Sequence, residues 1–248
     1  MDKSYANPVR IAMWSGPRNL STAMMRSFGA RADTVCIDEP FYAAYLKITG
    51  LDHPMRQEIL DCHDADPKDV ARNLSAGPTP APIFYQKHMA HHMVDGISWG
   101  WMSNVQNVFL IRNPARVLAS YAKKMEEVSL QAIGFDKQLE LVEFARDLTG
   151  KTPIIVDSDD ILRDKRGLLA ILCNQLGITF DETMLTWAQG PHPEDGAWAP
   201  HWYDAVYRST GFGNVSGELP QLSGEYEAVH QEALEIYETL AKFRIRPP

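Results

Sequence analysis

The strongest constraint on the fold is an apolar, strand-like run that ends directly in a polar loop. Residues 9–13 form the run, and a helix-compatible stretch, residues 20–28, follows the loop. A strand, a tight turn and a helix N-terminus make a site for an anion, because free backbone N–H groups and the positive end of the helix dipole point at it. Arg18 adds a full positive charge there, and Ser21 and Thr22 add hydroxyl donors.

A second apolar run also ends in a cation. Residues 108–111 read Val-Phe-Leu-Ile and are followed directly by Arg112. We predict a helix from Ala115 onwards, which places Ser120 in its second turn. Two strand ends that each hold an anion suit a ligand with two separated phosphate or sulfate groups.

The rest of the chain alternates short apolar runs with helical patterns, which is typical of a parallel sheet covered by helices. The 248 residues, 45% of them hydrophobic, can bury the core of one large domain. We therefore predict a single α/β domain over residues 1–248, with three layers and a central parallel sheet flanked by helices. The expected strands are residues 10–14, 34–37, 83–86, 107–111 and 153–156. The expected helices are residues 20–28, 56–62, 115–127, 137–148, 167–176 and 225–241.

Two stretches do not fit this alternation. Residues 76–82 contain prolines at every second position, which forbids a helix there and predicts a stiff connector. Residues 190–217 are rich in Gly, Pro, Trp and His. Because this second stretch is too apolar for a flexible tether, we predict a long functional loop.

The overall charge and composition limit the partners. The net charge is −8 at pH 7, whereas a nucleic acid or an anionic membrane would need a basic surface. The cysteines form no metal-binding pair, and His91 and His92 have no carboxylate or cysteine at ligand spacing. No apolar run approaches the roughly 18 residues of a membrane span. We expect a cytoplasmic protein that binds small molecules and holds no metal.

Three blocks of the sequence resemble the sulfotransferases that use 3′-phosphoadenosine 5′-phosphosulfate (PAPS), a P-loop-like nucleotide-binding α/β family. Residues 15–22, Ser-Gly-Pro-Arg-Asn-Leu-Ser-Thr, are similar to the family's 5′-phosphosulfate loop, although Asn-Leu stands where Ser-Gly is usual. Residues 111–114, followed by Ser120, are similar to its 3′-phosphate motif and keep the Arg-to-Ser spacing. Residues 156–162 are similar to its Tyr-Glu-Asp-Leu-Leu segment, without the tyrosine.

This resemblance implies PAPS as the sulfuryl donor and no metal. The first loop would hold the 5′-phosphosulfate, and Arg112 with Ser120 would hold the 3′-phosphate. Trp14, beside the first loop, either faces the adenine or the acceptor or packs in the core. The predicted donor-binding residues in these blocks are Trp14, Gly16, Pro17, Arg18, Asn19, Leu20, Ser21, Thr22, Arg112 and Ser120.

The candidate for closing over the nucleotide is a late segment, residues 207–213, which reads Tyr-Arg-Ser-Thr-Gly-Phe-Gly. The family closes over it with an Arg-Lys-Gly segment that contacts the 3′-phosphate, and the resemblance here is loose. It would give that part to Arg208 and Gly211. Ser209 and Thr210 would donate to the phosphate, and Phe212 would stack on adenine. The alternative is a packed aromatic loop.

An acceptor hydroxyl must lose its proton as it attacks sulfur, so a base is needed. Glu39 follows the second expected strand, at the carboxyl edge where such sheets bind ligands. Asp-Glu-Pro-Phe at this point resembles a segment that supplies a glutamate base in bacterial and carbohydrate sulfotransferases. Lys87 is predicted to stabilise charge on the transferring group, with His88 as a reserve base. On a continuing strand these two adjacent side chains would point to opposite faces.

Other functions were weighed against sulfuryl transfer. A kinase would need Gly-Lys-Ser/Thr where the chain has Ser21-Thr22-Ala23, so the P-loop lysine is missing. A non-catalytic nucleotide-binding protein on the same scaffold stays open. Nothing marks the Schiff-base lysine of an aminotransferase. The predicted acceptor is a small hydroxyl or amine compound, and the amphipathic C-terminal helix either completes the core or joins a homodimer.

Overall fold

The computed structural model describes residues 4–122, 128–215 and 217–246. Five strands form one parallel sheet in the order β2-β3-β1-β4-β5. The strands are β1 (Val9–Ser15), β2 (Thr34–Asp38), β3 (Ile83–Met89), β4 (Gln106–Ile111) and β5 (Ile154–Asp157). All five predicted strands are confirmed, and most extend one to three residues further than predicted.

Both faces of the sheet are buried, which explains why its strands are apolar throughout. Ile11 and Met13 on β1 belong to one hydrophobic cluster, and Ala12 and Trp14 belong to a second cluster on the opposite face. This alternation follows from the two-residue period of a strand.

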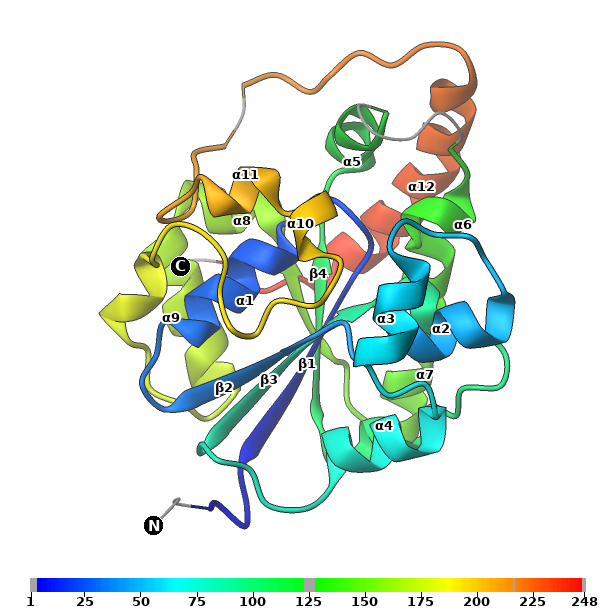
Figure 1. Ribbon diagram of the computed structural model, residues 1–248. Helices are drawn as coiled ribbons and strands as arrows, with labels where there is room; N and C mark the ends of the chain where they lie inside the picture. Colours follow the sequence, from blue (N-terminus) through cyan, green and yellow to red (C-terminus); the bar gives the residue numbers. More distant parts are fainter. Residues whose placement is uncertain (1–3, 123–127, 216, 247–248) are drawn as a thin grey trace.

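Helices cover the sheet on both sides and complete the three predicted layers (Figure 1). α1, α8 and α9 contribute to the first cluster, whereas α4, α7 and α12 contribute to the second. The helices are α1 (Ser21–Gly29), α2 (Tyr42–Thr49), α3 (Arg56–Cys62), α4 (Pro67–Ser75), α5 (Pro114–Tyr121), α6 (Leu130–Ile133), α7 (Phe135–Thr149), α8 (Ser158–Arg163), α9 (Lys165–Gln175), α10 (Ala199–Trp202), α11 (Asp204–Tyr207) and α12 (Glu225–Ala241). Three 3₁₀ helices, η1 (Ala90–His92), η2 (Gly100–Asn104) and η3 (Glu182–Leu185), lie between them.

The six predicted helices are present, and the sequence interpretation missed several others. α5 was expected to reach residue 127; it ends at Tyr121, and residues 123–127 lie outside the described part. α2 was missed because its N-cap, Phe41, makes no side-chain capping hydrogen bond. α4 carried a usable signal, since Asp66 caps it and Pro67 occupies its first turn. The predicted loop at 190–217 contains two short helices, α10 and α11.

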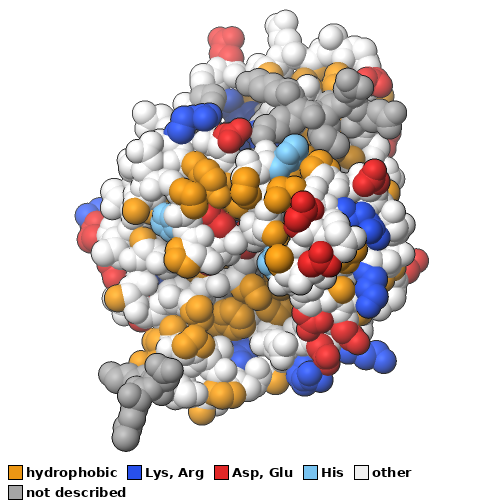
Figure 2. Space-filling model, viewed as in Figure 1, with side chains coloured by type: hydrophobic (Ala, Val, Ile, Leu, Met, Phe, Trp, Pro, Cys, Tyr) orange, Lys and Arg blue, Asp and Glu red, His pale blue; other side chains and the backbone are white. Residues whose placement is uncertain are grey.

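The surface shows charges of both signs. In Figure 2, hydrophobic side chains spread across the middle of the face in view, while basic side chains lie towards its edges among acidic ones. Among the helices that the structure describes, none combines the length and apolarity needed to cross a membrane.

Candidate functional site

The predicted site residues meet at the carboxyl edge of the sheet. The first loop leaves β1, Glu39 follows β2, Lys87 lies two residues before the end of β3 and Arg112 follows β4. β3 and β4 lie on either side of β1, so the chain diverges at the carboxyl end of β1, which is where open α/β sheets bind ligands. With neighbouring strands about 4.8 Å apart, the edge from β2 to β4 is about 14 Å long.

The first loop is held in shape by buried hydrogen bonds. Asn19 is fully buried; its amide donates to the Leu110 carbonyl at 3.4 Å, and the Ser158 hydroxyl donates to the Asn19 carbonyl at 2.8 Å. The Asn19 side chain therefore shapes the loop, and its predicted role in binding the sulfuryl donor is not supported. Leu20 caps α1 in the left-handed region and makes no side-chain capping bond, so Ser21 begins a helix whose first N–H groups have no side-chain cap.

Arg18, Ser120 and Arg112 form one cationic cluster. Arg18 Nε donates to Ser120 Oγ at 2.9 Å, and Arg112 Nη1 donates to the Arg18 carbonyl at 2.7 Å. The two predicted anion-binding segments are thus continuous. Within residues 4–122, 128–215 and 217–246, neither arginine pairs with a carboxylate.

The electrostatics of this cluster fit an anionic ligand. Burial lowers the pKa of Arg112, and the nearby Arg116 and Arg18 lower it further against the opposing effect of Asp159. Burial also lowers the pKa of Arg18. Both guanidinium groups stay charged at neutral pH. Arg112 Nε is buried and has no hydrogen-bond partner in the described structure. A bound phosphate oxygen would accept the hydrogen bond that this N–H group can donate.

The structure decides between the two predicted roles of Trp14. Its ring is fully buried, stacks on His88 with ring centroids 4.3 Å apart, and its indole N–H donates to Asn107 Oδ1 at 3.0 Å. A strand residue at this position of β1 faces the second hydrophobic cluster. The packing alternative was therefore right, and Trp14 faces neither adenine nor acceptor.

Glu39 sits in a buried polar cluster. Lys87 Nζ donates to Glu39 Oε1 at 2.5 Å and to Asp38 Oδ1 at 2.8 Å. The Tyr203 hydroxyl accepts from Lys87 at 2.8 Å and donates to Asp38 Oδ2 at 2.6 Å. His92 Nε2 lies 3.9 Å from Glu39 Oε2. Because burial and neighbouring groups lower the pKa of His92 well below its ordinary value, this contact is not an ion pair.

The pKa of Glu39 is raised, chiefly by burial, and the negative charge of Asp38 adds to the effect against the opposing attraction of Lys87. The pKa of Lys87 is raised well above its ordinary value because the neighbouring carboxylates outweigh the cost of burial. A carboxylate with a raised pKa is a better proton acceptor than an ordinary one. The cluster therefore suits Glu39 as a general base.

Lys87 and His88 point to opposite faces of the sheet, as expected for adjacent strand residues. Lys87 is 1% exposed and its ammonium is occupied by Asp38, Glu39 and Tyr203, so it orients the carboxylates instead of reaching a transferring group. His88 is enclosed by Trp14, Phe41 and Trp101, and burial lowers its pKa to about 3. Its predicted role as reserve base is not supported.

The chain matches the model of a sulfotransferase domain family over residues 9–244. It belongs to that family. This sulfotransferase domain is also similar to two curated proteins of Arabidopsis thaliana, named "Branched-chain-amino-acid aminotransferase-like protein" 2 and 1. Identities are 38% over 91% of the chain and 40% over 84% of it. The chain spans only 39% and 37% of the length of these relatives.

Solved structures support the same fold. The sulfotransferase domain of the Synechococcus PCC 7002 olefin synthase aligns with a TM-score of 0.53 and 17% identity, covering 97% of both chains. The sulfotransferase domain from the curacin biosynthetic pathway aligns with a TM-score of 0.54 and 14% identity, covering 97% of this chain and 99% of that one. At these identities the likeness shows the α/β fold alone.

The late segment of this sulfotransferase domain packs differently from the prediction. Ser209 Oγ accepts from the Trp187 indole at 3.1 Å, and the Phe212 ring meets Trp187 edge-on within the core. Gly211 pairs with Thr186 in an isolated bridge, while Arg208 and Thr210 are exposed. Stacking of Phe212 on adenine is therefore wrong.

Beyond this segment, the chain contacts Arg116, an electrostatic neighbour of Arg112, through a residue that the sequence did not indicate. The carbonyl of Gly217 accepts from Arg116 Nη2 at 2.8 Å, and Arg116 also pairs with Asp159 at 2.9 Å. The contact between the late part of the chain and α5 thus comes from backbone geometry, which no residue pattern in 207–213 announces.

The sequence analysis missed Tyr203, His92 and Tyr42 around Glu39. The concentration of aromatic residues in 190–217 was the available signal for Tyr203, but its partner could not be named from it. Tyr42 stacks on His92 with ring centroids 4.5 Å apart, and its hydroxyl lies 3.0 Å from His53 Nδ1.

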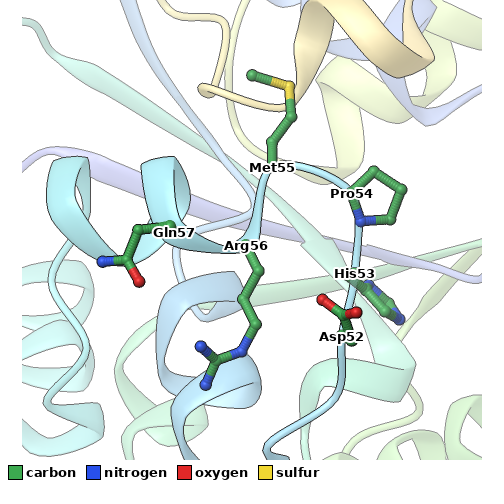
Figure 3. A pocket seen from close by; sticks show the side chains of 6 residues that line it. All are labelled: Asp52, His53, Pro54, Met55, Arg56 and Gln57. Carbon is green, nitrogen blue, oxygen red and sulfur yellow. The ribbon is translucent and has the colours of Figure 1, made fainter.

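His53 also lines an open depression formed by residues 52–57, where the chain enters α3 (Figure 3). Contacts through Tyr42 and His92 therefore connect His53, at this depression, to Glu39. In the part of the chain that the structure describes, no three His, Cys, Asp or Glu side chains are grouped to hold a metal ion.

Proposed function

We propose that this domain transfers a sulfuryl group from PAPS to a hydroxyl or amine of a small acceptor. The carrying observation is the pair Arg18 and Arg112, two charged guanidinium groups beside Ser120 with no carboxylate partner among the described residues. Glu39, a buried carboxylate with a raised pKa, lies on the same sheet edge. Membership of the sulfotransferase domain family supports this proposal.

The donor would lie on the cationic cluster and the first loop. Arg112 and Ser120 would hold the 3′-phosphate, and Arg18 with the first turn of α1 would hold the 5′-phosphosulfate. The donor supplies the sulfuryl group, whose bond to the bridging phosphate oxygen is the one that breaks. These cations stabilise the negative charge that develops on the departing phosphate side.

Glu39 would take the acceptor proton. Oε1 accepts a hydrogen bond from Lys87, whereas Oε2 lies 3.9 Å from His92 Nε2 and accepts no hydrogen bond from the described residues. Oε2 is therefore the atom offered to an acceptor. Lys87 and Asp38 hold the carboxylate in place. A phosphoryl-transfer alternative is less well supported, because the first loop has no P-loop lysine.

The experiment is calorimetric titration of the domain with 3′,5′-bisphosphoadenosine and with ADP. We expect the bisphosphate to bind at least about tenfold more tightly, because a charge-assisted hydrogen bond contributes roughly 1.5–3 kcal/mol. Arg112→Gln should remove that preference. Arg166→Gln, on the exposed surface of α9, is the matched control and should keep it.

Equal affinities for the two nucleotides in the unaltered domain would contradict the proposed donor. A preference that survives Arg112→Gln would place the 3′-phosphate elsewhere.

A further inference from the structure

The segment between residues 196 and 203 closes over the candidate base. Trp198 Nε1 donates to the Tyr203 hydroxyl at 3.2 Å, and the Gly196 backbone N–H donates to Asp38 Oδ2 at 3.2 Å. Tyr203 is 5% exposed, and its ring lies under Lys87, with Nζ 5.1 Å from the centroid. A segment far away in the sequence is thus anchored by the same polar groups that hold Glu39.

The cluster has one cation for two carboxylates, so the hydrogen bonds decide which carboxylate is better stabilised as an anion. Asp38 receives three donors: Lys87 at 2.8 Å, Tyr203 at 2.6 Å and the Gly196 N–H at 3.2 Å. Glu39 receives Lys87 at 2.5 Å, and the Tyr203 hydroxyl lies at 3.5 Å. Asp38 is therefore the better hydrogen-bonded carboxylate, and Glu39 keeps one oxygen free of this network.

We propose that Tyr203 is a positioning residue: its hydroxyl ties Asp38 and Lys87 together and thereby sets the ionisation of Glu39. This inference rests on the proposed function only in taking Glu39 as the proton acceptor. It gives the 190–217 segment a role in the proton-transfer step through Tyr203, whose hydroxyl contacts Lys87, Asp38, Glu39 and Trp198.

The groups around Glu39 define what its ionisation depends on. They come from the strand ends, from η1, from α2 and from the 196–203 segment, and are Asp38, Lys87, His92, Tyr42 and Tyr203. Among them the Tyr203 hydroxyl, whose proton is donated to Asp38, lies 3.5 Å from Glu39 Oε1 and lowers the pKa of Glu39 less than Lys87 does. Without it, Asp38 loses its shortest donor and draws Lys87 more strongly, which weakens the remaining support of the Glu39 anion. Both effects favour protonated Glu39.

The test is a carbon-13 NMR titration of the whole chain labelled at glutamate carboxyls, with the Glu39 resonance identified by its absence in Glu39→Gln. We expect Tyr203→Phe to move the Glu39 midpoint upward by at least about half a pH unit, a roughly threefold change in its ionisation constant. Tyr207→Phe is the control, because its ring meets Tyr203 edge-on while its hydroxyl interacts with Asp195. It should leave the midpoint in place.

An unmoved midpoint in Tyr203→Phe, or an equal shift in Tyr207→Phe, overturns the proposal. Trp198→Phe removes the donor to the same hydroxyl and should give a smaller upward shift, so the proposal stays testable if Tyr203→Phe does not fold. The titration needs neither donor nor acceptor. A domain that fails to bind 3′,5′-bisphosphoadenosine would overturn the proposed function and leave the role of Tyr203 to be judged by the titration alone.

Discussion

Backbone strain marks the proposed site at the scale of single residues. Among the described residues, four that are not glycine have a positive φ: Arg18 at 64°, Leu20 at 70°, Glu39 at 38° and Met55 at 61°. Such conformations are costly for residues with side chains and persist where the surrounding structure enforces them, often at functional sites. Three of the four belong to the donor loop or the candidate base, and Met55 lines the depression near Tyr42.

Glu39→Gln tests the base directly. Gln has nearly the same shape but cannot accept the acceptor's proton, so we expect release of 3′,5′-bisphosphoadenosine from PAPS, in a mixture of small alcohols and amines, to slow by about 10²–10⁴-fold. Affinity for 3′,5′-bisphosphoadenosine should stay within about twofold. Glu58→Gln, on the exposed surface of α3, is the control and should change neither quantity.

Unchanged release in Glu39→Gln would exclude this carboxylate as the base. Release absent even from the unaltered domain, with the nucleotide still bound, would favour the non-catalytic alternative.

Candidate residues could be named from the sequence where the signal is local. Arg18 and Arg112 were named because each is a cation shortly after a buried strand, and Ser120 because of its place in the next helix and its spacing from Arg112. Their roles as ligands remain predictions. Trp14 stayed ambiguous, since a strand pattern does not say which face a ligand occupies. Tyr203 was beyond prediction: its significance comes from contacts with residues more than a hundred positions earlier in the chain.

At the scale of elements, the donor loop depends on one close approach. A Cβ at Gly16 would collide with the backbone carbonyl of Ile133, at the end of α6. A Cβ at Gly134 would in turn lie 3.7 Å from Gly16 Cα and from His91 Cβ. The turn between α6 and α7 therefore packs directly on the loop, and only glycine allows both segments their observed positions.

Gly16→Ala should displace the loop. We expect a loss of about 1–3 kcal/mol in the free energy of unfolding, measured by urea denaturation, because backbone atoms must move to relieve the clash. Affinity for 3′,5′-bisphosphoadenosine should fall at least about tenfold. Gly213→Ala is matched to it, since a Cβ there meets open space. A Gly16→Ala domain with unaltered stability and affinity would show that the turn after α6 yields freely.

Helices and strands could be predicted where their own residues carry a pattern, such as an apolar run or a capping residue. The strands were found because both faces are buried, which makes their apolar runs continuous. α7 was among the predicted helices, and it ends at Gly150, a C-cap in the left-handed region that favours glycine. α2 was missed because tertiary packing, and not a cap, specifies it: Tyr42, Ala43, Ala44, Tyr45 and Leu46 are all buried.

For the whole molecule, the fold class could be predicted because short apolar runs alternate with helical patterns along the chain. The order of the strands in the sheet could not be predicted in this way. A parallel sheet places all carboxyl ends on one edge, so the site residues could be expected to share that edge. Which strands are neighbours depends on packing between distant elements. The order β2-β3-β1-β4-β5 brings Glu39 next to Lys87 and the donor loop between Lys87 and Arg112.

Three histidines connect this edge to the stability of the whole domain: His88 and His92 are buried, and His91 is half-buried. Burial is the main cause that lowers the pKa of His88 to about 3, that of His91 to about 4 and that of His92 well below its ordinary value. In the unfolded chain a histidine has a pKa of about 6.5. As the pH falls below that value, the unfolded state therefore binds protons that the folded state does not.

The histidines therefore make the folded state less stable in acid. Their contribution to the free energy of unfolding is fully present above about pH 6.5 and is lost as the pH falls towards about 4. Each histidine contributes a slope approaching about 1.4 kcal/mol per pH unit in the free energy of unfolding. Urea denaturation at several pH values between 7 and 4.5 measures it. His88→Gln removes one titrating group and keeps a side chain that can reach Gln86, the hydrogen-bond partner of His88. Its stability should decline with acid less steeply by about 1.4 kcal/mol per pH unit. Parallel curves for the two proteins would mean that His88 takes up its proton equally in the folded and unfolded states, and thus that the aromatic enclosure around it opens to water.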